Sequence, residues 1–505
     1  MTLSGLVRRL PDALIQRNSH TTISDIVYDS RAIVPGALFV ALRGADADGH
    51  DYAGEAVHRG ARALLIERPL DLDLPQIVVA DSRAALARIA ATFFGDPSTA
   101  LGVIGVTGTD GKTTTSHLVD AILRATGRTT GLVGTVEVRI GDLVTAHSSR
   151  QTTPESVDLQ RSLRAMVDAG VSWATLEATS HGLAMHRLDE VAFQVAAVTN
   201  ITHEHLDFHK TIESYRQAKG ILFARVAASG GTAVINVDDP GARAMLPVAR
   251  GAKQMTYSAD GGSADLRALR IRPIRHGSQF DLEINGWGVI PVDLPMIGNF
   301  NVANALCAIG CAWAAGIEPP AAAAALREAP AVPGRMARID AGQPFAVVID
   351  YAHTPDALQK VLPLLRAHHP DGRLIAVFGS AGERDRAKRP RQGEVAAKLA
   401  DYAVFTTEDP RHEDPDAIIA EIATGAAAAG WRSGADFVTL TDRREAIRHA
   451  LGRAQPNDCV LLAGKGHEDS IIWGREKRPW DEATVAREEL ARLGYHPSPE
   501  ISPAR

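Results

Sequence analysis

Residues 101–115 read LGVIGVTGTDGKTTT, an apolar run that passes directly into a loop of glycines and threonines. Leu101–Thr107 is apolar and β-branched, which is typical of a buried strand. The polar residues from Lys112 onward are expected to open a helix. In a loop between a strand and a helix, backbone N–H groups can surround phosphate oxygens, and the helix N-terminus adds a favourable dipole. The stretch therefore predicts a nucleotide-binding phosphate loop in an α/β domain.

Two side chains of the loop suit nucleotide chemistry. Lys112 would neutralise the β- and γ-phosphates, and the Thr113 hydroxyl would bind Mg²⁺. One position departs from the usual phosphate loop, because Val106 stands where a glycine is expected. The alternative, a glycine-rich turn that binds nothing, is disfavoured by the strand–loop–helix context.

Strand-like runs alternate with helical stretches along most of the chain, a pattern typical of parallel sheets with helices on both faces. Breaks at residues 95–97 and 330–334 divide the sequence. We therefore expect an α/β protein with domains at residues 1–98, 99–333 and 334–505. The expected strands lie near residues 37–42, 63–66, 76–79, 101–107, 131–136, 173–179, 195–201, 232–238, 345–351, 373–379, 402–407, 437–441 and 459–463.

Composition limits the class of protein. A chain of 505 residues is too long for one core, and its 45% hydrophobic and 23% charged residues are normal for a soluble globular protein. The net charge of -6 argues against a dedicated nucleic-acid binder. Three cysteines cannot form a disulfide framework. The sequence has neither a long apolar run nor the features of a signal peptide, so we expect a cytoplasmic protein without a membrane span.

Polar clusters follow the predicted strands, and parallel sheets bind ligands at the carboxyl ends of their strands. Glu177 ends one strand, and His203, His205, Asp207 and His209 crowd the loop after the next. This loop could be merely solvated or could bind zinc, although zinc would prefer more cysteines or a regular histidine spacing. Beside a phosphate loop, Mg²⁺ held by Glu177 and one histidine is the favoured interpretation.

An ordered series of motifs resembles the Mur ligase family, and within it the UDP-muramoyl-tripeptide synthetases. The resemblance covers nearly the whole chain. The motifs are GTDGKTT at 108–114, LEATSHGL at 176–183, EHLDFH at 204–209, AK at 218–219, GNFNVAN at 298–304, PGRM at 333–336, DYAHTPD at 350–356 and GKGHE at 464–468.

This resemblance implies a fold and a reaction. The small N-terminal α/β domain would bind the UDP moiety, the central parallel-sheet domain would be a P-loop ATPase, and the Rossmann-like C-terminal domain would bind an amino acid. The chain would be an ATP-dependent ligase that adds a diamino acid to the D-glutamate of UDP-N-acetylmuramoyl-L-alanyl-D-glutamate. An acyl phosphate would be the intermediate. Its partners would be these small molecules, and we expect a monomer.

The resemblance also implies residue roles. Catalysis is expected from Lys112, Glu177, His205 and Lys219, and Mg²⁺ binding from Thr113, Glu177, His205 and Lys219 in its carbamylated form (N6-carboxylysine). From the sequence alone, Lys219 is an ordinary helix lysine. ATP contacts are expected at Gly108, Thr109, Asp110, Gly111, Lys112, Thr113, Thr114, Asn301, Arg335 and His353. Contacts to the UDP-muramoyl dipeptide are expected at Ser30, Arg31, Thr152, Thr153, Thr179, Ser180 and Arg187, with Met185 where the family pattern suggests glutamine.

The implied amino-acid pocket contains two conflicting charges. Its residues are Arg384, Glu408, Asp409, Pro410, Arg411, Gly464 and Glu468. Diaminopimelate enzymes typically have Asp-Asn-Pro-Arg where this chain has Glu-Asp-Pro-Arg. Arg411 can hold a distal carboxylate bidentately, whereas Asp409 would repel it and would suit lysine or ornithine. Arg411 and Glu468 together match the zwitterionic end of meso-diaminopimelate, which we favour over lysine or ornithine.

Two other functions are compatible with parts of this pattern. One is a sister ligase of the same fold, such as a folylpolyglutamate synthase. The Thr-Thr-Pro, Asp-Pro-Arg and Gly-Lys-Gly-His-Glu motifs speak against it. The other is a nucleotide-dependent regulatory module without catalysis, which would not need Glu177, His205 and Lys219 together.

Overall fold

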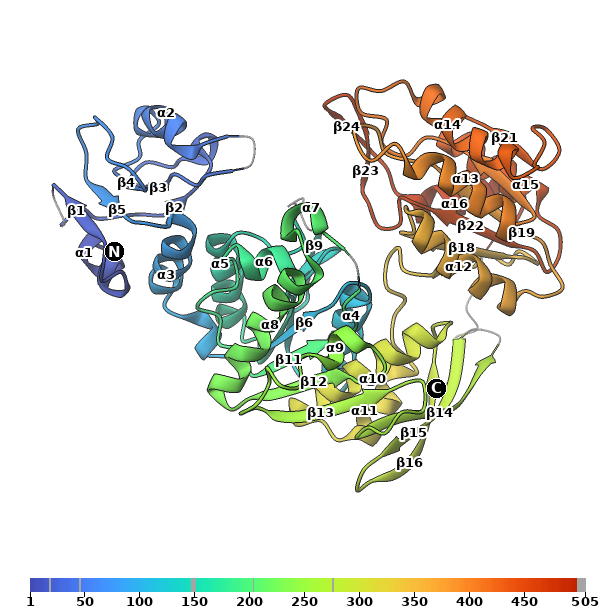
Figure 1. Cartoon of the computed structure of the whole chain (residues 1–505), viewed down its shortest axis with the longest axis horizontal. Coiled ribbons are helices and arrows are strands. Elements are labelled where there is room, and N and C mark those ends of the chain that lie inside the picture. Colours follow the sequence, from blue (N-terminus) through green and yellow to red (C-terminus); the bar gives the residue numbers. More distant parts are fainter. Residues whose placement is uncertain (18–19, 45–46, 147–150, 203, 275–276, 497–505) are drawn as a thin grey trace. The chain divides into compact units, whose positions relative to one another are not determined.

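The computed structural model describes residues 1–17, 20–44, 47–146, 151–202, 204–274 and 277–496. The chain forms two compact units, and each contains its own hydrophobic core. Figure 1 shows the helices and strands of the chain with the labels used below. The first unit comprises Met1–Ile271, Phe280–Asp293 and Asn299–Ala329. The second comprises Arg272–Gln279, Leu294–Gly298 and Pro330–Arg505.

The N-terminal part of the first unit is a five-stranded sheet in the order β1-β5-β4-β3-β2. Only β1 runs antiparallel to its neighbour, and the other pairs are parallel. The strands are β1 Leu14–Gln16, β2 Ile26–Val27, β3 Leu38–Val40, β4 Ala63–Ile66 and β5 Gln76–Val78. The helices are α1 Leu3–Leu6, α2 Ala53–His58 and α3 Ser82–Phe94, with 3₁₀ turns η1 Val7–Arg9, η2 Ser30–Ala32, η3 Gly49–Tyr52 and η4 Pro97–Thr99.

A second sheet of the first unit carries the phosphate loop. Its order is β16-β15-β14-β13-β12-β11-β6-β10-β7-β8-β9. The strands from β13 to β7 pair in parallel, whereas β8 and β9 are antiparallel additions at one end. The strands are β6 Gly102–Thr107, β7 Thr130–Val133, β8 Glu137–Ile140, β9 Leu143–Ala146, β10 Trp173–Glu177, β11 Val195–Val198, β12 Thr232–Asn236, β13 Lys253–Ser258, β14 Leu266–Ile274, β15 Gly277–Ile284 and β16 Gly288–Leu294.

Helices cover both faces of this sheet. On β12, Ala233 and Ile235 pack into a core with α5 and α8, whereas Val234 lies against α10 on the other face. Such two-sided burial accounts for the apolar, β-branched character of the central strands. The helices are α4 Lys112–Ala125, α5 Ser156–Asp168, α6 Ser180–Ala184, α7 Leu206–His209, α8 Ile212–Ser229, α9 Pro240–Arg243, α10 Asn299–Ala314 and α11 Pro319–Leu326.

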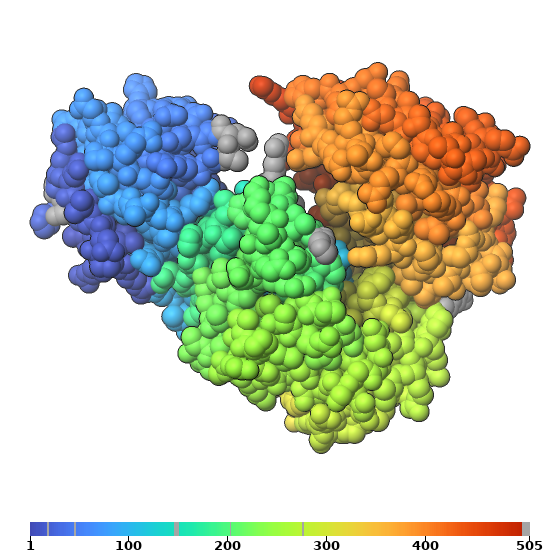
Figure 2. Space-filling view, viewed as in Figure 1, coloured from blue at the N-terminus to red at the C-terminus, as the bar shows by residue number. Residues whose placement is uncertain are grey.

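The second unit is a doubly wound α/β domain with sheet order β17-β18-β22-β19-β20-β21. Alternate residues of β18 belong to two cores, Val347 and Ile349 to one and Ala346 and Val348 to the other. In the space-filling view most of this unit is the orange to red part of the surface (Figure 2). The strands are β17 Ala337–Ile339, β18 Ala346–Asp350, β19 Leu374–Phe378, β20 Tyr402–Phe405, β21 Phe437–Thr439, β22 Cys459–Ala463, β23 Ser470–Trp473 and β24 Glu476–Pro479. The helices are α12 Pro355–His368, α13 Lys388–Leu399, α14 Pro415–Ala428, α15 Arg443–Arg453 and α16 Glu482–Arg492.

The predicted α/β class is confirmed, and each predicted strand is present, often shortened at its carboxyl end. The polar clusters follow β6, β10, β11, β18, β19, β20 and β22, as expected of ligand sites in parallel sheets. The antiparallel strands β8 and β9 and the extension from β13 to β16 were not predicted. In the described part of the chain, no helix combines the length and the apolar character needed to cross a membrane.

Candidate active site

The phosphate loop joins β6 to α4 along a path that leaves no room for side chains at two glycines. Gly111 precedes α4 with a φ of +84°, and a Cβ there would lie 2.4 Å from Asn304 Oδ1. A Cβ at Gly108 would lie 1.9 Å from Thr199 Oγ1. The first N–H groups of α4 have no helical partners and can bind an anion, as a phosphate site requires.

Val106 belongs to β6 and not to the loop. It is fully buried and pairs in register with Glu177 of β10 and Ala197 of β11. A β-branched residue packs better than glycine in a central strand. The departure at this position therefore leaves the phosphate loop intact.

Lys112 opens α4 and folds back over the loop. Its Nζ donates to the carbonyl oxygens of Gly108 at 3.0 Å and Thr109 at 2.8 Å. The Thr109 N–H donates to the Asn200 carbonyl at 2.8 Å, and the Asp110 N–H donates to Asn200 Oδ1 at 2.9 Å. Among the described residues no carboxylate forms an ion pair with Lys112, so its charge can serve a phosphate.

Glu177 is a buried carboxylate, only 1% exposed, at the end of β10. The hydroxyls of Thr113 and Thr135 donate to its Oε2 at 3.1 and 3.0 Å, and the Thr135 N–H donates to Oε1 at 2.8 Å. Gly134 makes room for it, because a Cβ there would lie 2.5 Å from Oε1. The loop threonine and the carboxylate predicted to share a metal are thus in direct contact.

This arrangement fits Mg²⁺, which prefers carboxylate and hydroxyl oxygens. No cation of the described chain forms an ion pair with Glu177, so a bound metal would balance a buried charge. The described residues contain no group of three His, Cys, Asp or Glu side chains that could hold a metal by itself. Thr113, Glu177 and substrate phosphate oxygens would then supply ligands together.

Lys219 is buried in α8 beside the phosphate loop. It is 1% exposed, and its Nζ donates to the Gly108 carbonyl at 2.7 Å and lies 4.5 Å from the centre of the Tyr215 ring. Burial, and then the charge of Lys112, hold the pKa of Lys219 well below its usual value. A lysine in such surroundings is readily deprotonated, and the neutral amine is a nucleophile.

His205 lies in a cluster of aromatic rings rather than against Glu177. Its ring centre is 4.6 Å from that of His181, and its side chain is 44% exposed. His181 in turn lies 5.4 Å from His209. Burial, and then the electrostatic effect of the neighbouring His205 and His209 side chains, lowers the pKa of His181 to about 4. His203 lies outside the described residues, and the predicted pairing of His205 with the metal stays a prediction.

Two threonines after β9 connect their loop to the region around Glu177. Thr152 Oγ1 lies 3.0 Å from Thr135 Oγ1. Thr153 Oγ1 donates to the Glu177 carbonyl at 2.8 Å and lies 2.9 Å from Thr179 Oγ1. The predicted dipeptide residues Thr152, Thr153 and Thr179 therefore lie around the end of β10.

The guanidinium of Arg187 is bound by neighbouring residues of the chain. Its Nε donates to Glu155 Oε1 at 3.1 Å and one terminal nitrogen donates to the Thr153 carbonyl at 3.2 Å. The other terminal nitrogen donates to Met185 Sδ at 3.6 Å, so the residue found in place of glutamine still contacts the arginine. The buried Ser180 hydroxyl, by contrast, has no hydrogen-bond partner in the described structure and can bind a ligand.

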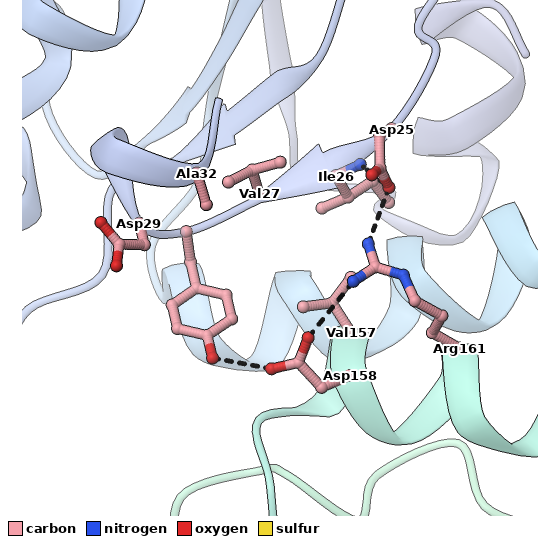
Figure 3. Close-up of a pocket in the computed structure, with 9 residues that line it drawn as sticks. Asp25, Ile26, Val27, Asp29, Ala32, Val157, Asp158 and Arg161 are labelled. Carbon is pink, nitrogen blue, oxygen red and sulfur yellow. Dashed lines mark hydrogen bonds and ion pairs between the residues drawn. The ribbon is translucent and has the colours of Figure 1, made fainter. Parts of the chain in front are cut away.

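Ser30 and Arg31 lie in η2, next to a cavity of about 240 Å³ between β2 and α5 (Figure 3). Ser30 Oγ donates to Glu55 Oε2 at 3.2 Å, and Arg31 pairs with Asp29. In the cavity, Arg161 bridges Asp25 and Asp158. Ser30 is buried while Arg31 is exposed, so the two predicted uridine contacts differ in accessibility.

The predicted nucleotide residues are divided between the two units. In the first, Thr114 and Asn301 are buried, and Asn304 Nδ2 donates to Asn301 Oδ1 at 3.2 Å. In the second, the Arg335 guanidinium lies 5.0 Å from the centre of the Tyr351 ring, and His353 Nδ1 lies 3.0 Å from the Tyr351 carbonyl. An aromatic ring flanked by an arginine and a histidine suits a planar base.

In the predicted amino-acid pocket, Asp409 already has a counterion. Lys465 Nζ lies 2.9 Å from Asp409 Oδ1 and 2.5 Å from Glu468 Oε2. The Ile472 N–H donates to Asp409 Oδ1 at 3.0 Å. The predicted anion at Asp409 is therefore paired inside the protein, and it shares the single charge of Lys465 with Glu468.

Arg411 has no such partner. In the described structure its guanidinium forms no ion pair, and its buried Nε has no hydrogen-bond partner. Glu408 is buried, and its Oε2 likewise has no hydrogen-bond partner in the described chain. A Cβ on Gly464 would lie 3.1 Å from that oxygen, so a side chain at this position would crowd the carboxylate. Pro410 is buried and Arg384 is exposed.

Comparison with known proteins finds matches along most of the chain. Family models match at residues 22–94 (Mur ligase family, catalytic domain), 106–312 (Mur ligase middle domain) and 334–466 (Mur ligase, glutamate ligase domain). A UDP-N-acetylmuramyl-tripeptide synthetase of Roseiflexus is 47% identical over 98% of this chain and 100% of the relative. The chain belongs to the Mur ligase family. This Mur ligase is therefore an ATP-dependent ligase of peptidoglycan precursor synthesis.

Two further relatives of this Mur ligase carry a more specific name. A UDP-N-acetylmuramoyl-L-alanyl-D-glutamate–2,6-diaminopimelate ligase of Geobacillus kaustophilus is 41% identical over 98% of this chain and 100% of the relative. The solved structure of a ligase with the same name has a TM-score of 0.70 and 31% identity, and it covers 98% of this chain and 100% of the other. The expected family and three-part fold are confirmed.

Sequence reasoning missed three residues of this Mur ligase that the structure places in the site. Thr135 binds Glu177, Asn304 closes on Gly111, and Lys465 joins Asp409 to Glu468. Thr135 follows β7 at the same sheet edge as Glu177, and Lys465 lies inside the GKGHE motif, so both had a positional signal. Asn304 ends the GNFNVAN motif, but the motif does not indicate that this residue lies beside Gly111, because α10 meets the loop only through the tertiary fold.

Proposed function

We propose that this ligase joins meso-diaminopimelate to the D-glutamate carboxylate of UDP-N-acetylmuramoyl-L-alanyl-D-glutamate. The observation that carries the choice of amino acid is Arg411, an unpaired guanidinium in the predicted pocket of the described chain. Diaminopimelate has a distal carboxylate that a guanidinium binds bidentately, and lysine and ornithine lack it. The names of relatives about 40% identical to this chain support the same substrate.

The charge balance of the pocket supports this choice. The ion pair of Asp409 with Lys465 weakens the repulsion that Asp409 would exert on a distal carboxylate. Glu408 has a buried oxygen without a partner in the described chain, and it can accept a hydrogen bond from an ammonium group. Opposite charges at the two positions suit the zwitterionic end of diaminopimelate.

The proposed chemistry has two steps. A carboxylate oxygen of D-glutamate attacks the γ-phosphorus of ATP, and the bond to the β-γ bridging oxygen breaks to release ADP. The amine then attacks the acyl phosphate, loses a proton, and expels inorganic phosphate from a tetrahedral intermediate. Lys112 would neutralise the phosphates during the first step, and Thr113 and Glu177 would hold Mg²⁺. A bound Mg²⁺ supplies positive charge that stabilises the transferring phosphoryl group.

Lys219 would serve this site as a carbamate. Its amine, made less basic by burial, attacks CO₂ and loses a proton, which converts a cation into an anionic carbamate. This group would lie beside the Gly108 carbonyl at the phosphate loop and add an anionic ligand for a second Mg²⁺ with His205.

The remaining assignments follow from the same scheme. Residues 1–98 would bind the UDP moiety through Ser30 and Arg31, and residues 99–333 would form the ATPase domain. Residues 334–505 would bind the amino acid and would add Arg335 and His353 to the ATP site. Because ATP and UDP-linked precursors are cytoplasmic, the enzyme would act in the cytoplasm.

The test is a phosphate-release assay with ATP, Mg²⁺, UDP-muramoyl dipeptide and each of three amino acids: meso-diaminopimelate, lysine and ornithine. We expect phosphate release that depends on the amino acid, with diaminopimelate showing the largest kcat/KM and a tripeptide product of the matching mass. Release with lysine or ornithine alone would contradict the choice of amino acid. Absence of tripeptide with all three would contradict the proposed reaction.

A further inference from the structure

Lys465 is a fully buried lysine that lies between two carboxylates of the amino-acid pocket. It is 0% exposed, and its Nζ contacts Asp409 Oδ1 at 2.9 Å and Glu468 Oε2 at 2.5 Å. Burial alone would lower the pKa of Lys465, but Glu468 and Asp409 outweigh it and raise that pKa. The lysine therefore keeps its charge in the interior.

The same contacts position the Asp-Pro-Arg loop. Asp409 Oδ1 also accepts the Ile472 N–H at 3.0 Å, which ties the loop to β23. Two residues on, the Arg411 N–H donates to the Ile472 carbonyl at 3.0 Å and the Gly474 N–H donates to the Arg411 carbonyl at 2.7 Å. Arg411 is thereby held with a φ of +53°, an uncommon conformation for a residue other than glycine.

The contacts of Lys465 bear on the availability of Arg411 for the substrate. Asp409 is two residues from Arg411 in the sequence, and its carboxylate is already bound by Lys465. The carboxylate of Glu468, a second anion of the pocket, is also bound by Lys465. Among the described residues Arg411 forms no ion pair, whereas both of these carboxylates are bound by Lys465.

We propose that Lys465 is a positioning residue that determines amino-acid specificity: by binding Asp409 and Glu468 it leaves the Arg411 guanidinium for the distal carboxylate of the substrate. The inference rests on the proposed diamino-acid ligase function. It explains how a chain with Asp409 in place of the usual asparagine can still accept a dicarboxylic diamino acid.

Removal of the charge should therefore change selectivity and not only rate. In Lys465→Gln, the amide can still donate to one carboxylate, but Asp409 becomes free to pair with Arg411. The ratio of kcat/KM for meso-diaminopimelate over that for lysine should fall at least tenfold, because only the former depends on a charge-assisted Arg411 pair. KM for ATP should stay within about threefold of the wild type, since phosphate binding uses other residues.

A second substitution separates this effect from a loss of structure. In Lys465→Gln/Asp409→Asn the competing anion is removed, so the diaminopimelate-to-lysine ratio should return to within about threefold of the wild type. Lys465→Arg keeps the charge and should keep the ratio. Arg373→Met is the matched control. Arg373 pairs with Asp458, and these two residues lie just before β19 and β22, whereas Lys465 follows the carboxyl end of β22. This variant should change kcat/KM by the same factor for all three amino acids.

The outcomes are distinct. If the wild type makes no tripeptide with diaminopimelate, the proposed function fails, and the specificity role fails with it. If the wild type uses diaminopimelate but Lys465→Gln weakens all amino acids equally and Asp409→Asn does not rescue it, only the inference is overturned. Should Lys465→Gln not fold, Lys465→Arg decides: a retained ratio supports the inference and a lost ratio overturns it.

Discussion

At the scale of single residues, Lys112 is the charge on which ATP turnover depends. It has no carboxylate partner in the described chain, and its Nζ donates hydrogen bonds to two loop carbonyl oxygens. Lys112→Ala should lose roughly 3 kcal/mol of transition-state stabilisation, a fall of at least a hundredfold in phosphate release, with an unchanged Tm. Lys253→Ala, which removes an exposed lysine of β13, is the control. Near-normal phosphate release from folded Lys112→Ala would contradict the role of this lysine.

Lys219 allows a second residue-scale test. Lys219→Ala should be nearly inactive, and added bicarbonate should not restore it, because the amine that carries the carbamate is gone. Acetate or formate should restore part of the activity by supplying an anion in the vacated space. Intact-protein mass and phosphate release in CO₂-depleted buffer provide the check. Full activity of the wild type without CO₂ would rule out a carbamate.

At the scale of elements, the start of α4 can be compared with the turn after it. Gly111 and Gly127 have φ values of +84° and +83°, but a Cβ meets Asn304 only at Gly111 and meets nothing within 4 Å at Gly127. Each change to alanine should cost about 1 kcal/mol of backbone strain. Only Gly111→Ala should also raise KM for ATP at least tenfold, because the loop must shift. Equal KM values for the two variants would show that the loop tolerates the side chain.

The elements also show what sequence could and could not predict. Strands such as Ala63–Ile66 and Cys459–Ala463 were predictable because burial on both faces leaves only apolar residues. The strands Glu137–Ile140 and Leu143–Ala146 lie at an exposed end of the sheet and carry no such run. The phosphate loop was visible as a local motif. The contact of Lys465 with Asp409 was not, since 56 residues separate them.

At the scale of the whole molecule, the two halves of the predicted site are built on different units. The phosphate loop, Glu177 and Lys219 belong to the first unit, and the amino-acid pocket belongs to the second. Each unit packs around cores of its own, so a substitution in one pocket need not disturb the other. Sequence motifs predicted which residues belong to each part of the site. They did not predict the contacts that these side chains make with one another.

This separation allows a selective prediction for Arg411. Arg411→Ala should lower kcat/KM for meso-diaminopimelate at least tenfold more than for lysine or ornithine, because a charge-assisted bidentate pair contributes about 1.5–3 kcal/mol. KM for ATP should be unchanged, since Arg411 is not among the residues predicted to contact ATP. The measurement is kcat/KM for the three amino acids at saturating ATP. An equal loss with all three would mean that Arg411 binds the shared α-carboxylate or is structural, and the choice of diaminopimelate would lose the observation that carries it.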